Sequence, residues 1–209
     1  MAVAQTEKEE FYNALTHAIG FLLSLLGFGL LIYYQQQTKT WNFTSIVLYG
    51  LSLTFLYSAS TLYHYVKKEK QKYYFRILDH ISIYFLIAGT YSPVVLIILG
   101  HSKGWLLFWI VWGIAAFGTI LKLFFTGKFE ILSLLLYLVM GWLIVFDFTA
   151  LKAAIPENAM YLLIAGGISY TLGIVFYVWE KLPFNHVIWH LFVLAGSIFH
   201  FLMIFIYII

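Results

Sequence analysis

Residues 104–121 read GWLLFWIVWGIAAFGTIL, a run of eighteen residues without a formal charge. At about 1.5 Å of rise per residue, a helix of this length spans about 27 Å, close to the roughly 30 Å hydrocarbon core of a bilayer. The apolar residues leave no polar stripe along such a helix, as expected of a segment surrounded by lipid and other helices. The run therefore predicts a helix that crosses a membrane.

Similar apolar runs lie on both sides of this segment, separated by short polar or charged connections. The strands of a membrane β-barrel are about 10 residues long and alternate polar with apolar positions. The runs in this chain are about twice that length, so helices are the expected structure. We predict an all-α, polytopic membrane protein with one domain over residues 1–209. The seven predicted spans cover residues 15–34, 41–65, 77–99, 104–121, 131–151, 158–179 and 184–208.

The composition excludes several classes of protein. Hydrophobic residues make up 63% of the chain, charged residues make up 10%, and the mean hydropathy is +0.90. Soluble domains are roughly 45–50% apolar and about 25% charged. Neither a soluble domain nor a nucleic-acid-binding module fits these values, and membrane lipids are the expected surroundings and partners of the chain. Because the chain has no cysteine, any metal would be held by nitrogen and oxygen atoms.

Lysine and arginine are distributed unevenly between the two sides of the predicted bundle. Nine precede the first span or lie near the second, fourth and sixth connections, whereas three lie on the other side. Since Lys and Arg in short loops stay cytoplasmic, we expect a cytoplasmic amino terminus and an external carboxyl terminus. The nine are Lys8, Lys67, Lys68, Lys70, Lys72, Arg76, Lys122, Lys128 and Lys181, and the three are Lys39, Lys103 and Lys152.

Five polar side chains are expected to lie at one level near the cytoplasmic face. Ser60 and His64 are four residues apart near the inner end of the second span, Asp79 begins the third, and His186 and His190 begin the seventh. Residues at i and i+4 share one face of a helix. Ionisable groups at membrane depth are costly and therefore mark candidate functional sites.

The pair His186 and His190 places two imidazoles about 6 Å apart along one helical face. With His64, they would give a metal ion three ligands and leave a position for water, as in catalytic zinc sites. Asp79 would be a fourth ligand, or it would accept a hydrogen bond from the water and act as general base. Ser60 is suited to a hydrogen bond with that water or with a substrate carbonyl.

Each of these features also has a purely structural interpretation. Two histidines in an apolar helix commonly form hydrogen bonds between helices. Asp79 could form a salt bridge with Arg76 across one helical turn. Ser60 could bond to a carbonyl of its own helix. The convergence of the five groups at one depth favours the metal site.

The other histidines are expected to be outside this cluster. His200 lies about 15 Å further along the seventh span than His190, and His101 lies in an outer loop. His80 points about 100° away from Asp79 around the helix. We expect His17 to be an interfacial residue at the start of the first span, with a supporting role beside the metal ligands as the alternative.

Four stretches resemble the motifs of bacterial hemolysin III proteins, which belong to the PAQR group of progestin and adipoQ receptors. They are NALTHAIG at 13–20, SASTLYH at 58–64, RILDHISIYFLIAGTYSP at 76–93 and HVIWHLFVLAGSIFHF at 186–201. The resemblance covers nearly the whole chain. It implies a multi-pass protein of a cell membrane, with the bacterial inner membrane as the expected location.

The resemblance also implies a site and an activity. Zinc would be bound near the cytoplasmic face by His64, His186 and His190, with water held by Asp79 and with Ser60 close by. Alkaline ceramidases, which share this pattern in a wider superfamily, hydrolyse lipid amides. The function that this resemblance implies is zinc-dependent hydrolysis of a lipid amide or ester, with a small lipid substrate or ligand as the expected partner besides membrane lipids. The alternatives are a lipid sensor or membrane-homeostasis protein with structural zinc, and a pore-forming cytolysin.

Overall fold

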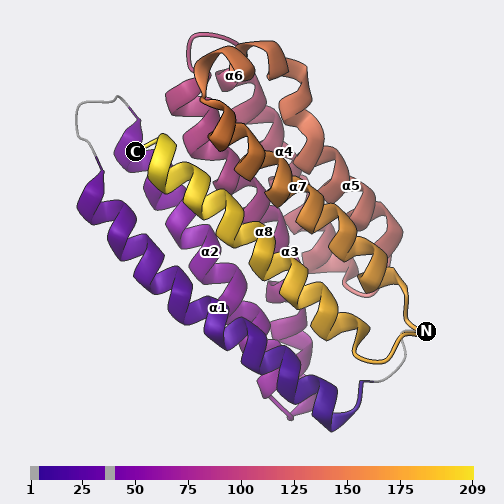
Figure 1. Ribbon diagram of the computed structural model, residues 1–209. Helices are drawn as coiled ribbons and strands as arrows, with labels where there is room; N and C mark the ends of the chain where they lie inside the picture. The colour runs from indigo at the N-terminus through magenta and orange to yellow at the C-terminus, as the bar shows by residue number, and fades with distance from the viewer. Residues whose placement is uncertain (1–4, 36–40) are drawn as a thin grey trace.

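The computed structural model describes residues 5–35 and 41–209, and helices make up most of this part of the chain (Figure 1). Lys39, one of the three lysines assigned to the outer side, lies outside the described residues. The α-helices are α1 (Glu7–Tyr34), α2 (Asn42–Tyr65), α3 (Glu69–Pro93), α4 (Gly104–Phe125), α5 (Glu130–Trp142), α6 (Phe148–Ala154), α7 (Glu157–Val178) and α8 (Asn185–Tyr207). A π-helical segment, Val94–Ile98, continues α3, and a 3-10 segment, Leu143–Asp147, joins α5 to α6.

Seven of the helical stretches among the described residues are long and apolar enough to cross a bilayer. The third combines α3 with the π-helical segment, Glu69–Ile98, and the fifth runs from α5 to the end of α6, Glu130–Ala154. The prediction of an all-α protein with seven spans is confirmed. The chain is a multi-pass protein of the cell membrane.

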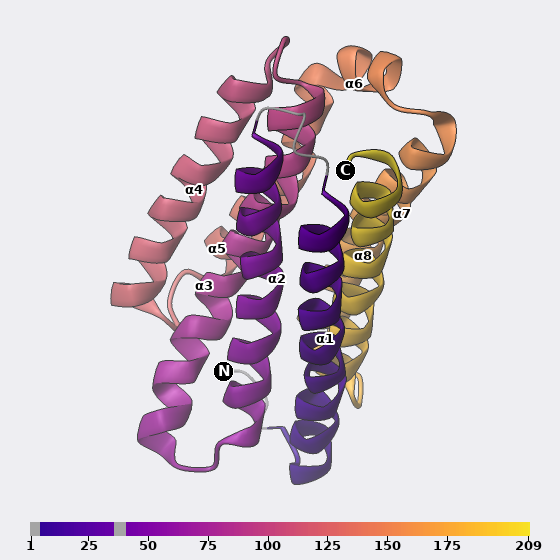
Figure 2. The same cartoon turned by 90° about the vertical axis from the view of Figure 1, so that its left-hand side faces the viewer.

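The long helices pack side by side into one bundle (Figures 1 and 2). α2 packs between α1 and α3, α4 packs on α3, and α8 contacts both α1 and α7. α1 and α8 run in the same direction along the bundle, as Figure 1 shows by their colour gradients. The first turns of α1 and α8 therefore lie at the same end of the bundle.

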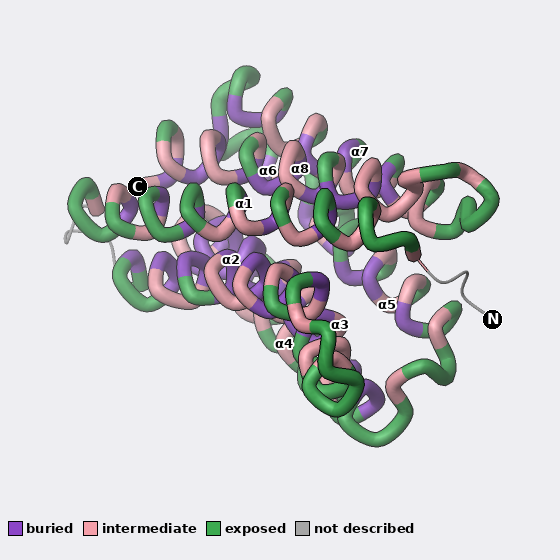
Figure 3. Tube along the Cα trace, turned by 90° about the horizontal axis from the view of Figure 1, so that it is seen from below, coloured by how far each residue is buried: buried purple, intermediate pink, exposed green. Residues whose placement is uncertain are grey.

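The outer face of the bundle is largely apolar. Figure 3 shows exposed positions on the outward sides of the helices and buried positions between them. Large apolar side chains such as Leu22, Leu26 and Phe124 are exposed on this surface. A bilayer is the environment in which such a surface is stable, because lipid tails are as apolar as these side chains.

α1 begins at Glu7 rather than near residue 15, and its first turn explains the difference. Thr6 and Glu9 form a capping box: the Glu9 N–H donates to Thr6 Oγ1 at 3.2 Å, and the Thr6 N–H donates to Glu9 Oε2 at 2.8 Å. This reciprocal pair satisfies amide groups that have no partner at the start of a helix. Polar residues assigned by sequence to the region before the first span therefore belong to the helix itself.

α1 and α2 approach closely at a glycine. A Cβ atom at Gly20 would collide with the ring of Tyr57, which is 1% exposed. The Tyr57 ring has little freedom to move away, because its hydroxyl donates to Ser197 Oγ on α8 at 2.8 Å. The absent side chain at Gly20 therefore allows α1 to lie against α2, in agreement with the role of small residues in membrane helix packing.

Candidate metal centre

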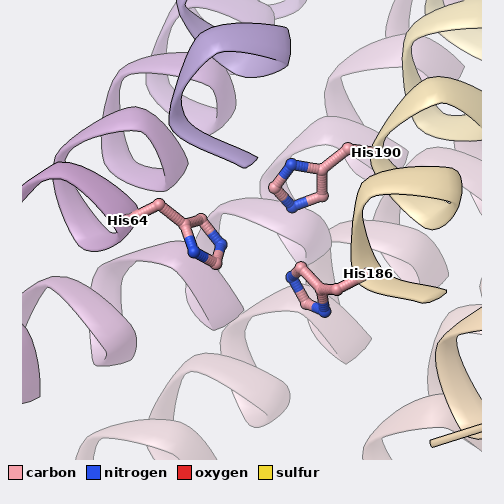
Figure 4. A group of neighbouring side chains, drawn as sticks. All are labelled: His64, His186 and His190. Carbon is pink, nitrogen blue, oxygen red and sulfur yellow. The ribbon is translucent and has the colours of Figure 1, made fainter. Parts of the chain in front are cut away.

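The structure brings together three histidines that are widely separated in the sequence (Figure 4). One ring nitrogen from each of His64, His186 and His190 lies within 4.8 Å of the corresponding atoms of the other two. The ring centroids are 5.1 Å apart for His64 and His186, 5.0 Å for His64 and His190, and 4.6 Å for His186 and His190. These three side chains lie close enough to bind a metal ion.

The helix geometry accounts for this grouping. His186 and His190 lie one turn apart in the first two turns of α8, and His64 is the next-to-last residue of α2. α2 ends at the same end of the bundle at which α8 begins, so the three imidazoles meet between the two helices (Figure 4).

The donor set fits zinc. Nitrogens bound to tetrahedral zinc at 2.0–2.1 Å are about 3.4 Å apart, so shifts of each ring by about 1 Å would close the observed triangle to that spacing. The buried Nε2 of His64 makes no hydrogen bond within the described part of the chain. A buried nitrogen lone pair without a partner is costly, and coordination of a cation would remove that cost.

The other ring nitrogen of two of these histidines already has a partner on α1. His64 Nδ1 lies 2.7 Å from Glu10 Oε2, and His190 Nδ1 lies 3.2 Å from the carbonyl oxygen of Asn13 and 3.3 Å from Thr16 Oγ1. A carbonyl can only accept a hydrogen bond, so Nδ1 of His190 carries the proton. The Nε2 atom of that ring is then free to act as a ligand.

Asp79 and Ser60 line a pocket beside the histidines. The pocket has a volume of about 130 Å³, and His186 and His190 also line it. Asp79 is 9% exposed and Ser60 is 1% exposed. Most of the remaining lining is apolar and includes residues such as Leu86, Ile87, Leu138 and Val193. One end of the pocket therefore carries histidines and a carboxylate, whereas most of its wall is apolar.

Arg76 has a partner other than the one considered from sequence. Its Nη2 lies 3.8 Å from Glu130 Oε1, and the fully buried Lys122 donates to Glu130 Oε2 at 2.7 Å. His80 Nδ1 lies 3.8 Å from the same carboxylate, and His80 and Glu130 also line the pocket. Glu130, the first residue of α5, is therefore the centre of a cluster of charged side chains.

The expectation that His17 is an interfacial residue is wrong. Its side chain is 3% exposed, and its ring stacks on that of His190. His17 therefore lies on the face of α1 that packs against α8, at the level of His190. His200 packs deep in the bundle, where its Nε2 lies 3.2 Å from the carbonyl oxygen of Leu163, and His101 is exposed.

Sequence reasoning missed two of the supporting residues on α1, Glu10 and Asn13, whereas a supporting role for His17 was considered as the alternative. Glu10, Asn13 and His17 follow one another at spacings of three and four residues, which places them on one face of a helix. This pattern in EKEEFYNALTHAIG was a usable signal, but Glu10 and Asn13 were assigned to the polar segment before the first span, which was expected to begin near residue 15. The capping box at Thr6 would have extended the helix and revealed the polar face.

The fold and the site define the class of protein: an integral membrane protein whose helical bundle gathers three histidines beside a buried aspartate. The profile of the family described as "Haemolysin-III related" matches residues 5–201. The chain therefore belongs to the haemolysin-III related family, and the resemblance inferred from the motifs is confirmed.

Individual relatives agree with this assignment. The chain is 44% identical over 208 residues to Hemolysin-3 of Bacillus cereus, covering 99% of this chain and 95% of the relative. It is 44% identical over 193 residues to the Hemolysin-3 homolog of Bacillus subtilis (strain 168), covering 92% and 91%. It is 31% identical over 204 residues to the human Monocyte to macrophage differentiation factor, covering 92% and 82%.

Proposed function

We propose that this protein is a zinc-dependent hydrolase of lipid amides or esters, with its site near the cytoplasmic face of the membrane. The observation that carries the proposal is the arrangement of His64, His186 and His190 at the polar end of a pocket lined by Asp79 and Ser60. Three neutral imidazoles suit zinc, whereas calcium and magnesium prefer oxygen ligands.

Each part of the pocket has a chemical role in this proposal. Zinc held by the three histidines would polarise the substrate carbonyl and lower the pKa of a water molecule towards 7. Asp79 accepts a proton from the attacking water and returns it to the leaving amine or alcohol. Ser60 donates a hydrogen bond to the carbonyl oxygen as negative charge develops on it. The apolar wall of the pocket holds the acyl chain of the substrate and keeps water away from that chain.

The cytoplasmic placement rests on charge. Nine of the twelve Lys and Arg residues lie at or near the end of the bundle that contains the histidines. Residues of this kind in short connections remain on the cytoplasmic side. The proposed substrate would therefore enter the pocket from the inner leaflet of the membrane.

Substitution of Asp79 tests the reaction. Purified wild-type protein and Asp79→Asn would be incubated with a panel of lipid amides and esters, and released fatty acid would be followed by mass spectrometry. We expect Asp79→Asn to retain most of its metal and to lose about 10²–10⁴-fold in rate, because the general base is removed.

Asp147→Asn is a matched control. Asp147 is also buried, but it lies at the opposite end of the bundle, where it accepts hydrogen bonds from Ser102 Oγ and the Lys103 N–H, both at 2.9 Å. This variant should hydrolyse lipids at the wild-type rate. Equal rates for wild type and Asp79→Asn would reject the role given to Asp79.

A second candidate function is a lipid-responsive protein in which zinc is structural. The name of one relative, Monocyte to macrophage differentiation factor, describes a differentiation factor and no reaction. In this case Asp79→Asn would change stability or lipid binding, and wild-type protein would release no fatty acid from any lipid in the panel. A pore-forming role, suggested by the name Hemolysin-3 of two relatives, would appear as dye leakage from vesicles instead.

A further inference from the structure

The first turns of α1 contact both helices that carry the candidate metal ligands. Glu9 Oε1 accepts a hydrogen bond from the Phe184 N–H at 2.9 Å, immediately before α8 begins. Glu10 contacts His64 near the end of α2. None of the three histidines of the cluster lies on α1, yet this helix determines how two of them are held.

Of these two glutamates, Glu10 is the one that contacts a candidate metal ligand directly. Its Oε2 lies 2.7 Å from His64 Nδ1, and its Oε1 lies 2.5 Å from Lys72 Nζ on α3. The Glu10 side chain is 22% exposed and that of His64 is 1% exposed. Hydrogen bonds to an ionised carboxylate are stronger than those between neutral groups, and partial burial strengthens them further.

We propose that Glu10 is a positioning residue of the zinc site proposed above. An ionised carboxylate can only accept hydrogen bonds, and the Lys72 ammonium group beside it supplies the opposite charge. His64 must then carry its proton on Nδ1. Its Nε2 is left unprotonated and turned towards His186 and His190.

As a result, the His64 ring is held in the orientation that metal coordination requires. A free imidazole exchanges between two tautomers and rotates about the bond that joins it to Cβ. The bond to Glu10 restricts both, so less ordering is needed when the metal binds. A carboxylate behind a ligating imidazole also makes its other nitrogen more basic, and loss of such a partner typically weakens metal binding about 10–100-fold.

The test is zinc affinity, measured by competition with a chelator on detergent-purified full-length protein. We expect Glu10→Ala to bind zinc about 10–100-fold more weakly than wild type. Glu10→Gln should fall between the two, because its amide oxygen still accepts from Nδ1 but carries no charge. Cobalt(II) in place of zinc provides a second readout, since its visible absorption reports the coordination geometry.

Two controls separate positioning of His64 from other effects. Glu7→Gln removes a charge from the same turn of α1 at an exposed side chain, 3.5 Å from Lys67, and should leave zinc affinity unchanged. Lys72→Met removes the other ion pair of Glu10 while leaving its bond to His64, and should change the affinity by only a few fold. Thermal unfolding with excess chelator would show whether the metal-free variants are folded.

The outcomes are distinct. Wild-type affinity in Glu10→Ala, or a full loss of affinity in Lys72→Met, would overturn the role assigned to Glu10. If Glu10→Ala does not fold without metal, the near-isosteric Glu10→Gln decides the question by the same comparison. Absence of zinc binding by the wild-type protein would overturn both this inference and the proposed function. If the wild-type protein binds zinc and Glu10→Ala binds it equally well, only the role assigned to Glu10 is overturned.

Discussion

The imidazole rings of His17 and His190 are stacked, with 3.5 Å between their centroids and 11° between their planes. The protonated Nδ1 of His190 also donates a hydrogen bond to the carbonyl oxygen of Asn13. The hydrogen bond restricts rotation of the ring in its own plane, and the stack restricts its tilt. His17 therefore completes the support of one candidate ligand.

This stack leads to a prediction for two substitutions at one position. His17→Ala removes the flat surface behind His190 and should weaken zinc binding by up to about tenfold. His17→Phe retains a planar ring and should stay within a few fold of wild type. Chelator competition measures both variants. An affinity in His17→Ala equal to that of wild type would show that the stack contributes nothing to metal binding.

Metal content gives a direct prediction for the candidate centre. We expect one zinc ion per chain by elemental analysis, and a marked loss of zinc in His190→Ala because one of three ligands is removed. His101→Ala is the matched control, since His101 is exposed and should not affect zinc content. Full zinc occupancy in a variant lacking His64, His186 and His190 would exclude the site.

The effect of pH on stability follows from the same ligands. Imidazole must be unprotonated to bind a metal, so acidification releases the ion. A metal that binds only the folded protein adds about 2.7 kcal/mol of stability at a free concentration 100 times its Kd. This contribution should be present near neutral pH and lost as the pH falls. Melting temperatures with zinc and with chelator should therefore converge in acid. A zinc-dependent difference that persists unchanged in acid would argue against histidine ligands.

Orientation in the membrane can be measured independently of the metal. The charge asymmetry predicts that a reporter fused after Lys72 is cytoplasmic and that one fused after Lys103 is external. A pair of enzymatic reporters, each active on only one side of the membrane, distinguishes these positions. The reverse pattern would place the histidine cluster at the outer face and would contradict the proposed access from the inner leaflet.

Packing between α1 and α2 gives a prediction for stability. In Gly20→Ala the new methyl group would collide with the Tyr57 ring, and overpacking of this kind costs about 1–3 kcal/mol. Gly29→Ala is the control on the same helix, because nothing lies within 4 Å of a Cβ atom at that position. It should be neutral or slightly stabilising, since alanine favours the helix more than glycine does. Unfolding of both variants in detergent would test the difference.

The amino-acid sequence by itself determined the seven spans and the depth of the candidate ligands. Bilayer thickness and helical rise relate the length of an apolar run to a crossing, and alternating span directions place each polar residue at one end of the bundle. His64, Asp79 and His186 could therefore be assigned to one level without knowledge of which helices are neighbours. The repeat of the α-helix also placed His186 and His190 on one face.

Only the tertiary structure decided which groups meet at that level. Depth depends on local sequence, whereas rotation of each helix about its axis and its choice of neighbours depend on packing over the whole bundle. The contact of Glu10 with His64 joins residues 54 apart in the sequence, and that of Asn13 with His190 joins residues 177 apart. Both contacts require α1 to lie against α2 and α8 in one rotation. Side chains far along the chain, such as that of Tyr57 against Gly20, determine that rotation.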